Sequence, residues 1–190
     1  MLVHQFISIA ALLVVLGLCC SLIIYQWVTG VPPLSSSATE RADIIALLKR
    51  AELTSQAVIY ELGSGWGSLV IALARAFPEA QIRGIELSPF PYWVSRLRTR
   101  NIPNIHLQRD NFYNCDLSDA QAVTCYLMSK PMPKLAGFLD HSLAPGTPVV
   151  SLSFWFRERN VSAHVATGGA LRASALYRWP ARKSYEVRGL

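Results

Sequence analysis

The chain has 190 residues, with 18 Lys and Arg against 12 Asp and Glu, and its formal net charge is +6. The basic residues are scattered after position 40 without a nucleic-acid-binding motif, so we predict no nucleic-acid partner; they fit a solvated surface or one that attracts anionic lipid. The four cysteines form no C-x-x-C pair and the four histidines lie far apart, which excludes a disulfide framework and a metal site and favours a reducing compartment.

A long apolar segment opens the chain. Phe6 to Val28 holds no charged residue across 23 positions, which matches the roughly 20 residues that cross a bilayer core. Tyr25 and Trp27 are placed as interfacial anchors. A cleaved signal peptide fits less well, because no Lys or Arg precedes the run and no small-x-small site precedes Thr29. We predict one transmembrane anchor over residues 1–28; a buried core helix is the alternative.

The charges that flank this segment predict its orientation. No basic residue precedes it, whereas Arg41, Lys49 and Arg50 follow it. The positive-inside rule therefore places the domain that follows on the cytoplasmic side. The N-terminus lacks an arginine-rich presequence, which favours a bacterial inner membrane over a mitochondrial membrane.

Residues 29–40 are rich in Pro and Ser and are interpreted as a linker. A helix is predicted over Glu40–Ala51, because apolar residues recur there at helical spacing, and its cap is expected near Ser37 or Thr39. Residues 41–190 then form one domain, and a domain of roughly that size buries about 68–70% of its unfolded surface.

Strands and helices alternate regularly through this domain. The alternation predicts a parallel sheet with helices on both faces, and ligands that bind at the carboxyl ends of the strands. The predicted elements are strand Val58–Leu62, helix Ser68–Phe77, strand Gln81–Glu86, helix Phe90–Arg100, strand Asn104–Arg109, strand Ala122–Leu127, helix Lys134–Leu143 and strand Thr147–Phe154. Two closing strands, Val161–Thr167 and Ala175–Trp179, are separated by a turn at Gly168-Gly169.

The turn after the first strand reads Glu61-Leu62-Gly63-Ser64-Gly65-Trp66-Gly67 and leads into a helix. A dinucleotide fingerprint needs a further glycine where Ser68 stands. The G-x-G-x-G spacing instead resembles motif I of the class I S-adenosylmethionine (SAM) methyltransferases. The resemblance implies a Rossmann-like α/β fold, SAM as cofactor, and cofactor contacts from Gly63, Ser64, Gly65 and Gly67. A tight turn without a ligand is the alternative.

Acidic residues stand at the ends of three predicted strands. Glu86 ends the second strand, where a carboxylate can accept hydrogen bonds from the two ribose hydroxyls. Asp110 and Asn111 follow the third strand, where an acid and a neighbouring backbone N–H can meet the adenine. Glu61 ends the first strand and can orient the cationic amino group of the methionine portion. The alternatives are a surface acid for Glu86, a helix or turn cap for Asp110, and a carboxylate that only closes the strand for Glu61.

The resemblance becomes closer in longer segments. One segment resembles a particular family, the membrane-anchored lysine methyltransferases related to the ATP-synthase c-subunit and adenine-nucleotide-translocase enzymes. Its pattern E-L-x-P…W-x-S-R-x-R is similar to Glu86-Leu87-Ser88-Pro89 followed by Trp93, Ser95, Arg96 and Arg98. Three further segments resemble the same family: Val31–Ser36, Val123–Met128 and Pro145–Ser151. Two positions depart from its pattern. Trp66 replaces an Asp in the glycine loop, and Ser129-Lys130 replaces a Pro after the fourth strand.

This family resemblance implies methyl transfer from SAM to a lysine side chain of a membrane protein. Tyr126, at the end of the fourth strand, is our candidate catalytic residue, because its hydroxyl can orient the lysine amine; packing in the sheet is its alternative. Ser35 and Ser36 are expected in a flap or in an ordinary linker. Two other functions stay open: a lipid or small-molecule methyltransferase with an apolar pocket from Phe90, Trp93 and Phe112, and a non-catalytic SAM-binding scaffold. The oligomeric state stays open.

Overall fold

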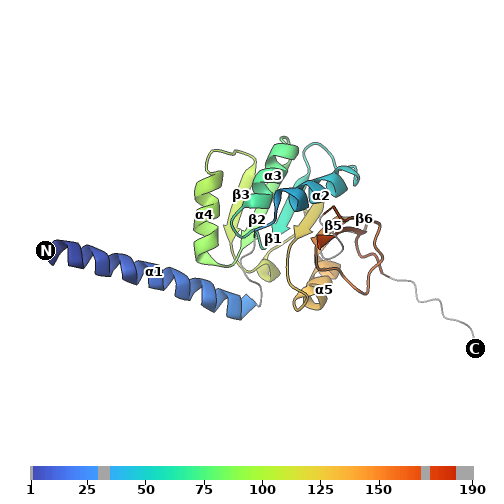
Figure 1. Ribbon diagram of the computed structural model, residues 1–190. Helices are drawn as coiled ribbons and strands as arrows, with labels where there is room; N and C mark the ends of the chain where they lie inside the picture. The colour runs from blue at the N-terminus through green and yellow to red at the C-terminus, as the bar shows by residue number, and fades with distance from the viewer. Residues whose placement is uncertain (1, 30–34, 168–171, 183–190) are drawn as a thin grey trace, which may run out of the picture.

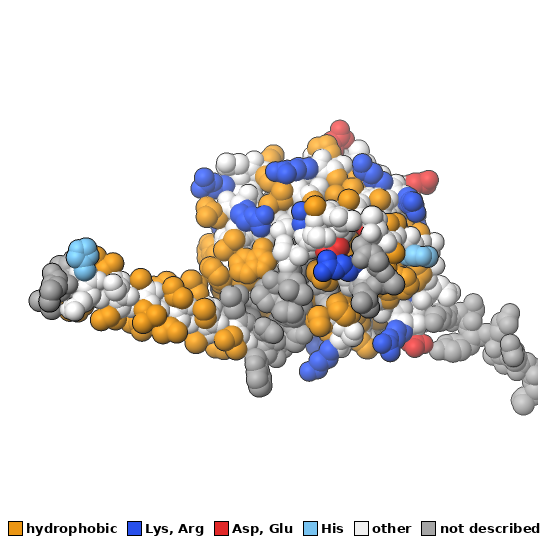
Figure 2. Space-filling view, viewed as in Figure 1, with side chains coloured by type: hydrophobic (Ala, Val, Ile, Leu, Met, Phe, Trp, Pro, Cys, Tyr) orange, Lys and Arg blue, Asp and Glu red, His pale blue; other side chains and the backbone are white. Residues whose placement is uncertain are grey.

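The computed structural model describes residues 2–29, 35–167 and 172–182 (Figure 1). Helix α1 (Leu2–Thr29) projects away from the rest of the molecule, and its surface is largely hydrophobic (Figure 2). Its segment His4–Ser21 has a mean hydropathy of 2.0 and is not buried. The helix is long and apolar enough to cross a membrane, and a signal sequence has the same properties.

The remaining elements follow the predicted order. They are α2 (Ala38–Lys49), β1 (Val58–Leu62), α3 (Ser68–Ala76), β2 (Gln81–Glu86), α4 (Pro89–Thr99), β3 (Ile105–Arg109), the short 3₁₀ helix η1 (Phe112–Asn114), β4 (Ala122–Cys125), α5 (Met132–Ser142), β5 (Pro148–Leu152), β6 (Ala163–Val165) and β7 (Ser174–Arg178). The predicted turn at Gly168-Gly169 lies outside the described residues.

The strands form one seven-stranded sheet in the order β3-β2-β1-β4-β5-β7-β6. The first five strands are parallel, as predicted, and confirm the Rossmann-like α/β fold. The two closing strands make the sheet mixed, because β7 pairs antiparallel with both β5 and β6. No direction was predicted for these two strands from the sequence. Parallel pairing of β6 with β7 would need a long crossover connection, and only residues 166–173 join these two strands.

Two hydrophobic layers enclose the sheet. Alternate residues of each strand point to opposite faces, so Ile59 packs with α2 and α3 while its neighbour Tyr60 packs with α5. Leu47 and Leu73 are fully buried on the first face, and Leu135 is fully buried on the second. Helix α4 packs against β2 and β3. The layers hold the carboxyl ends of the parallel strands at one edge of the domain.

Local chemistry sets where the elements begin and end. Ser37 caps α2 in a reciprocal capping box: its hydroxyl accepts from the Glu40 backbone, and the Glu40 carboxylate accepts from the Ser37 backbone. Strand β4 ends at Cys125, two residues earlier than predicted. Its partner position on β1 is Leu62, after which β1 turns into the glycine loop, so that β4 loses its pairing partner on that side. The predicted linker of residues 29–40 overlaps the first turn of α2.

Candidate active site

Four neighbouring parallel strands, β3, β2, β1 and β4, bring the predicted site residues to one edge of the sheet. Glu86 ends β2, the glycine loop follows β1, Asp110 follows β3, and Tyr126 follows β4. Because the carboxyl ends of parallel strands share an edge, residues from 61 to 126 in the sequence become neighbours. The structure therefore brings the predicted residues together at one edge of the sheet, and their role in binding stays a prediction.

The glycine loop adopts a backbone that side chains disfavour. Gly63, Gly65 and Gly67 have φ of 78°, 52° and 78°, all in the left-handed region. A Cβ on Gly67 would lie 2.2 Å from the hydroxyl oxygen of Ser95, so this glycine also lets the loop pack against α4. A Cβ on Gly65 would meet nothing within 4 Å. The loop is therefore packed on one side at Gly67 and open at Gly65.

The carboxylate of Glu86 is buried, with 8% of the residue exposed, and is held by backbone amides. Its Oε2 accepts from the N–H of Gly65 at 2.8 Å, and its Oε1 accepts from the N–H of Ser88 at 2.7 Å. A carboxylate has about four acceptor positions, so two backbone bonds leave capacity for a ligand. Glu86 thus fixes the glycine loop and keeps free acceptor positions at the strand end.

Glu61 is buried beneath the loop. Burial raises the pKa of Glu61 well above its usual value, and the negative charge of Glu86 raises it further, while a hydrogen bond from the Val70 backbone opposes the shift. Within the described part of the chain, Glu61 Oε2 and the hydroxyl of buried Ser64 have no hydrogen-bond partner. Unsatisfied buried polar atoms are uncommon and mark a place where a ligand can supply the partner.

Asp110 and Asn111 form a turn at the end of β3. The Asp110 carboxylate accepts from the Asn111 backbone at 2.7 Å and from the side-chain amide of Gln108 at 3.2 Å. The side chain of Asn111 caps η1 by accepting from the Tyr113 backbone at 3.2 Å. The residue that caps η1 is thus Asn111 and not Asp110, for which a cap was the alternative role. The Asn111 N–H must leave the Asp110 carboxylate before it can meet an adenine ring.

Tyr126 stands just past β4 and is half-buried. Burial raises the pKa of Tyr126, and the carboxylate of Glu40 raises it further, while Arg172 and a hydrogen bond with Ser153 lower it. Ser153 directly follows β5 and has φ of 63°, a conformation that costs a serine free energy. The phenol therefore keeps its proton at neutral pH and lies beside a strained residue that follows the neighbouring strand.

Two other predicted features are the residues beside the glycine loop and the apolar pocket. The hydroxyl of Ser35 donates to that of Ser68 at 2.8 Å, which places Ser35 beside the start of α3, and Ser36 is buried. The ring of Trp66 packs edge-on against Phe90, with 5.6 Å between centroids. The proposed apolar pocket does not gather as predicted. Phe112 packs against Tyr113 and Phe138 on the opposite layer, and Trp93 is 55% exposed on α4.

Three residues near the site were not predicted from the sequence: Gly84, Ser95 and Ser153. A Cβ on Gly84 would lie 2.7 Å from the side chain of Leu107 and 3.0 Å from that of Ser64, so Gly84 lets the loop approach β2. An isolated glycine in a strand is a recognisable signal of such an approach. Ser95 lies in the segment that resembles the family, but its packing against Gly67 comes from a distant part of the chain and was not predicted. Ser153 carries no local signal. Among the described residues, no cluster of three metal-binding side chains occurs.

Comparison with known proteins agrees with this geometry. The model of the ANTKMT methyltransferase domain matches residues 61–163, more than half of the chain. A protein-lysine N-methyltransferase of Saccharolobus islandicus (strain REY15A) is 28% identical over 139 residues, which cover 68% of this chain and 83% of that protein.

Solved structures share the fold. An RNA methyltransferase from Salinibacter ruber, in complex with S-adenosyl-L-homocysteine, is 28% identical with a TM-score of 0.67 and covers 80% of this chain and 96% of its own. PKMT2 from Rickettsia typhi, in complex with AdoHcy, has a TM-score of 0.51 at 16% identity, over 60% of this chain and 25% of its own, and shows the fold alone.

The residues at the strand ends fit the cofactor of these relatives. A polar ligand with a cationic group can find three kinds of contact here. They are the open side of Gly65, the unpartnered atoms of Glu61 and Ser64, and the spare acceptor positions of Glu86. The chain belongs to the ANTKMT methyltransferase family and is a SAM-dependent methyltransferase.

Proposed function

We propose that this enzyme transfers the methyl group of SAM to a lysine side chain of a membrane protein. One observation carries the proposal: the chain matches a protein-lysine N-methyltransferase across 83% of that protein's length. The long apolar helix α1 supports an acceptor at a membrane, because an anchored domain meets membrane proteins at high local concentration.

We further propose that α1 anchors the enzyme and that the domain of residues 41–190 lies on the cytoplasmic side, in a bacterial inner membrane. The uncharged segment Phe6–Val28 is followed by Arg41, Lys49 and Arg50, whereas no Lys or Arg stands at residues 1–5, and this asymmetry supports the orientation. SAM is made in the cytosol, so the proposed side is also the side where the cofactor is available.

In the proposed complex, Gly63, Ser64, Gly65 and Gly67 line the cofactor. Glu86 accepts from the ribose hydroxyls with its remaining acceptor positions, which supports the role predicted for it. Asp110 and the backbone of Asn111 contact the adenine. The buried, unpartnered oxygen of Glu61 faces the cationic amino group, directly or through water.

SAM supplies an activated methyl group, so the protein must align the acceptor with the S–CH₃ bond and exclude water, which can contribute roughly 7–11 kcal/mol. A lysine amine must first be neutral, and from a pKa near 10.4 this costs about 4.6 kcal/mol at pH 7. Burial of the amine lowers that cost. We assign Tyr126 to accept a hydrogen bond from the amine and so orient its lone pair. Its raised pKa keeps the phenol neutral, so no ionic pair with the amine forms to stabilise the ammonium.

RNA is the second candidate acceptor. The neighbour from Salinibacter ruber is named an RNA methyltransferase, and the net charge of this chain is +6. A lipid acceptor has less support, because Phe90, Trp93 and Phe112 do not form one pocket.

One experiment separates these acceptors. The full chain, incorporated in membranes, is supplied with SAM that carries a labelled methyl group, and the product is hydrolysed in acid and separated as amino acids. Methyl-lysine is the expected product. Label that ribonuclease releases, or that remains in a lipid fraction free of amino acids, would overturn the lysine assignment.

A further inference from the structure

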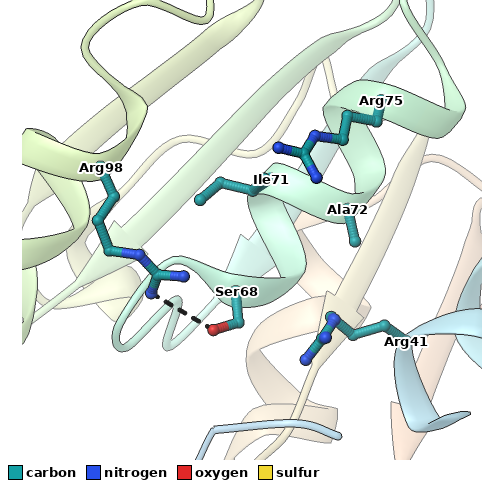
Figure 3. A pocket seen from close by; sticks show the side chains of 6 residues that line it. All are labelled: Arg41, Ser68, Ile71, Ala72, Arg75 and Arg98. Atoms are coloured by element: carbon teal, nitrogen blue, oxygen red, sulfur yellow. Dashed lines mark hydrogen bonds between the residues drawn. The ribbon is translucent and has the colours of Figure 1, made fainter. Parts of the chain in front are cut away.

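A basic pocket lies on the outer side of α3, apart from the residues proposed to contact SAM (Figure 3). Its volume is about 400 Å³. Arginines from three elements surround it: Arg41 of α2, Arg75 of α3 and Arg98 of α4. The other lining residues are Ser68, Ile71 and Ala72, which belong to α3. Among the residues that the structure describes, no acidic side chain lines the pocket.

Within residues 2–29, 35–167 and 172–182, none of the three guanidinium groups forms an ion pair with a carboxylate. The ion pairs between described residues join Arg83 to Asp119, Arg159 and Arg182 to Asp140, and Arg172 to Glu40, and so leave these three arginines out.

Two of these guanidinium groups are oriented by neutral acceptors. Arg41 donates to the Ser36 carbonyl, and Arg98 donates to the Trp66 carbonyl and, at 3.5 Å, to the hydroxyl of Ser68. These contacts position the guanidinium groups without cancelling their charge.

Such an arrangement favours an anion with several acceptor oxygens. Like charges that border one cavity repel each other, and an anion between them removes that repulsion. Guanidinium groups present planar pairs of donors that match phosphate oxygens. Ser68 begins α3, and its hydroxyl adds a neutral polar group to the lining of the pocket. We propose that this pocket binds the phosphate group of a ligand, independently of which acceptor the enzyme methylates.

The position of the pocket makes a phospholipid headgroup one source of that phosphate. Ser35 lies at the start of α3 through its contact with Ser68 and is six residues beyond Thr29, the end of α1. Six residues span at most roughly 20 Å. Helix α4, which carries Arg98, also contacts α1. If α1 crosses a bilayer, the pocket lies near its headgroups. A soluble phosphate compound is the other source.

The test measures whether phosphate protects the pocket arginines from chemical modification. The full chain in a neutral detergent is treated with phenylglyoxal, and modification of each arginine is measured by mass spectrometry. The probes are inorganic phosphate and a short-chain phosphatidylglycerol below its micelle concentration. We expect both to protect Arg75 and Arg98 while Arg157, an exposed arginine outside the pocket, stays reactive.

The variant Arg75→Gln should weaken the protection of Arg98 roughly tenfold, since one charge-assisted contact is lost. Arg50→Gln removes the same charge at the far end of α2 and should change nothing. Tighter protection by the lipid than by phosphate identifies a headgroup site, and equal protection identifies a soluble phosphate ligand. Absence of protection by both probes overturns the proposal. Loss of protection on saturation with S-adenosyl-L-homocysteine also overturns it, because the pocket would then belong to the cofactor site.

Discussion

The carboxylate of Glu86 accepts a hydrogen bond from the backbone N–H of Gly65, with 2.8 Å between Oε2 and N. This bond joins the end of β2 to the open part of the glycine loop, 21 residues earlier in the chain. The proposed binding of the ribose and the conformation of the glycine loop therefore depend on the same buried side chain. Replacing it should affect both.

We expect Glu86→Ala to weaken SAM binding by roughly 10- to 150-fold, because a hydrogen bond to a charged group contributes about 1.5–3 kcal/mol. Glu86→Gln keeps one acceptor oxygen and should lose less. Titration of SAM by calorimetry measures both. Glu79→Ala, at an exposed acid outside the site, is the matched control. Parent-like affinity in Glu86→Ala would show that the ribose lies elsewhere.

The two glycines Gly65 and Gly67 should respond differently to alanine. Both alanines adopt a positive φ, which costs about 1–2 kcal/mol. Only Gly67→Ala also brings a Cβ to 2.2 Å from the Ser95 hydroxyl, and such overpacking adds about 1–3 kcal/mol.

We therefore expect Gly67→Ala to lower the thermal unfolding midpoint more than Gly65→Ala does. The second change Ser95→Ala should recover part of the loss by removing the close oxygen. Thermal unfolding of the full chain in detergent measures all three variants. Equal midpoints for the two alanines would contradict the packing role of Gly67.

Much of the fold could be predicted from the sequence because its signals are local. The bounds of β1 and β2 agree with the structure, because each strand has an acid as its last or last-but-one residue, just before a glycine loop or a helix that begins at a proline. The spacing of Ser37 and Glu40 marks a capping box, and the structure contains it. Ligands of parallel sheets bind at the carboxyl ends of the strands, so the location of the site could be predicted before any contact was known.

The features that were not predictable depend on residues far apart in the chain. Ser153 is a serine in a conformation that favours glycine, so its sequence gives no warning. The arginine pocket assembles Arg41, Arg75 and Arg98 from three helices. Each arginine alone is typical of a solvated helix face. Only the packing of α2, α3 and α4 brings their charges together.

Glu61 should link SAM binding to pH. Its folded-state pKa is raised above the usual value of 4.5 by burial and by Glu86. The protonated side chain therefore stabilises the free enzyme, fully below pH 4.5, and this stabilisation is lost as pH rises through the raised pKa. A cationic amino group beside Glu61 favours the ionised form instead. SAM binding should then release a proton and strengthen with rising pH.

The variant Glu61→Gln tests this linkage because amide and acid have nearly the same shape. At neutral pH and above, we expect it to raise the unfolding midpoint of the free enzyme, since no buried charge forms. It should also weaken SAM binding and flatten its pH dependence. Calorimetry in two buffers of different ionisation enthalpy counts the released protons. An unchanged proton count in Glu61→Gln would assign the linkage to another group.

Tyr126→Phe should separate catalysis from cofactor binding. The change removes only the hydroxyl that we assign to orient the acceptor amine, and the side chain lies past β4 rather than on the glycine loop. Loss of one such hydrogen bond in the transition state should lower kcat roughly 10- to 150-fold, with SAM affinity unchanged. Single-turnover transfer from labelled SAM measures the chemical step. Tyr92→Phe, which removes a hydroxyl that contacts only Arg96 among the described residues, serves as the control. An unchanged rate in Tyr126→Phe would leave the tyrosine with a packing role, since its ring also lies against the core layer of α2 and α3.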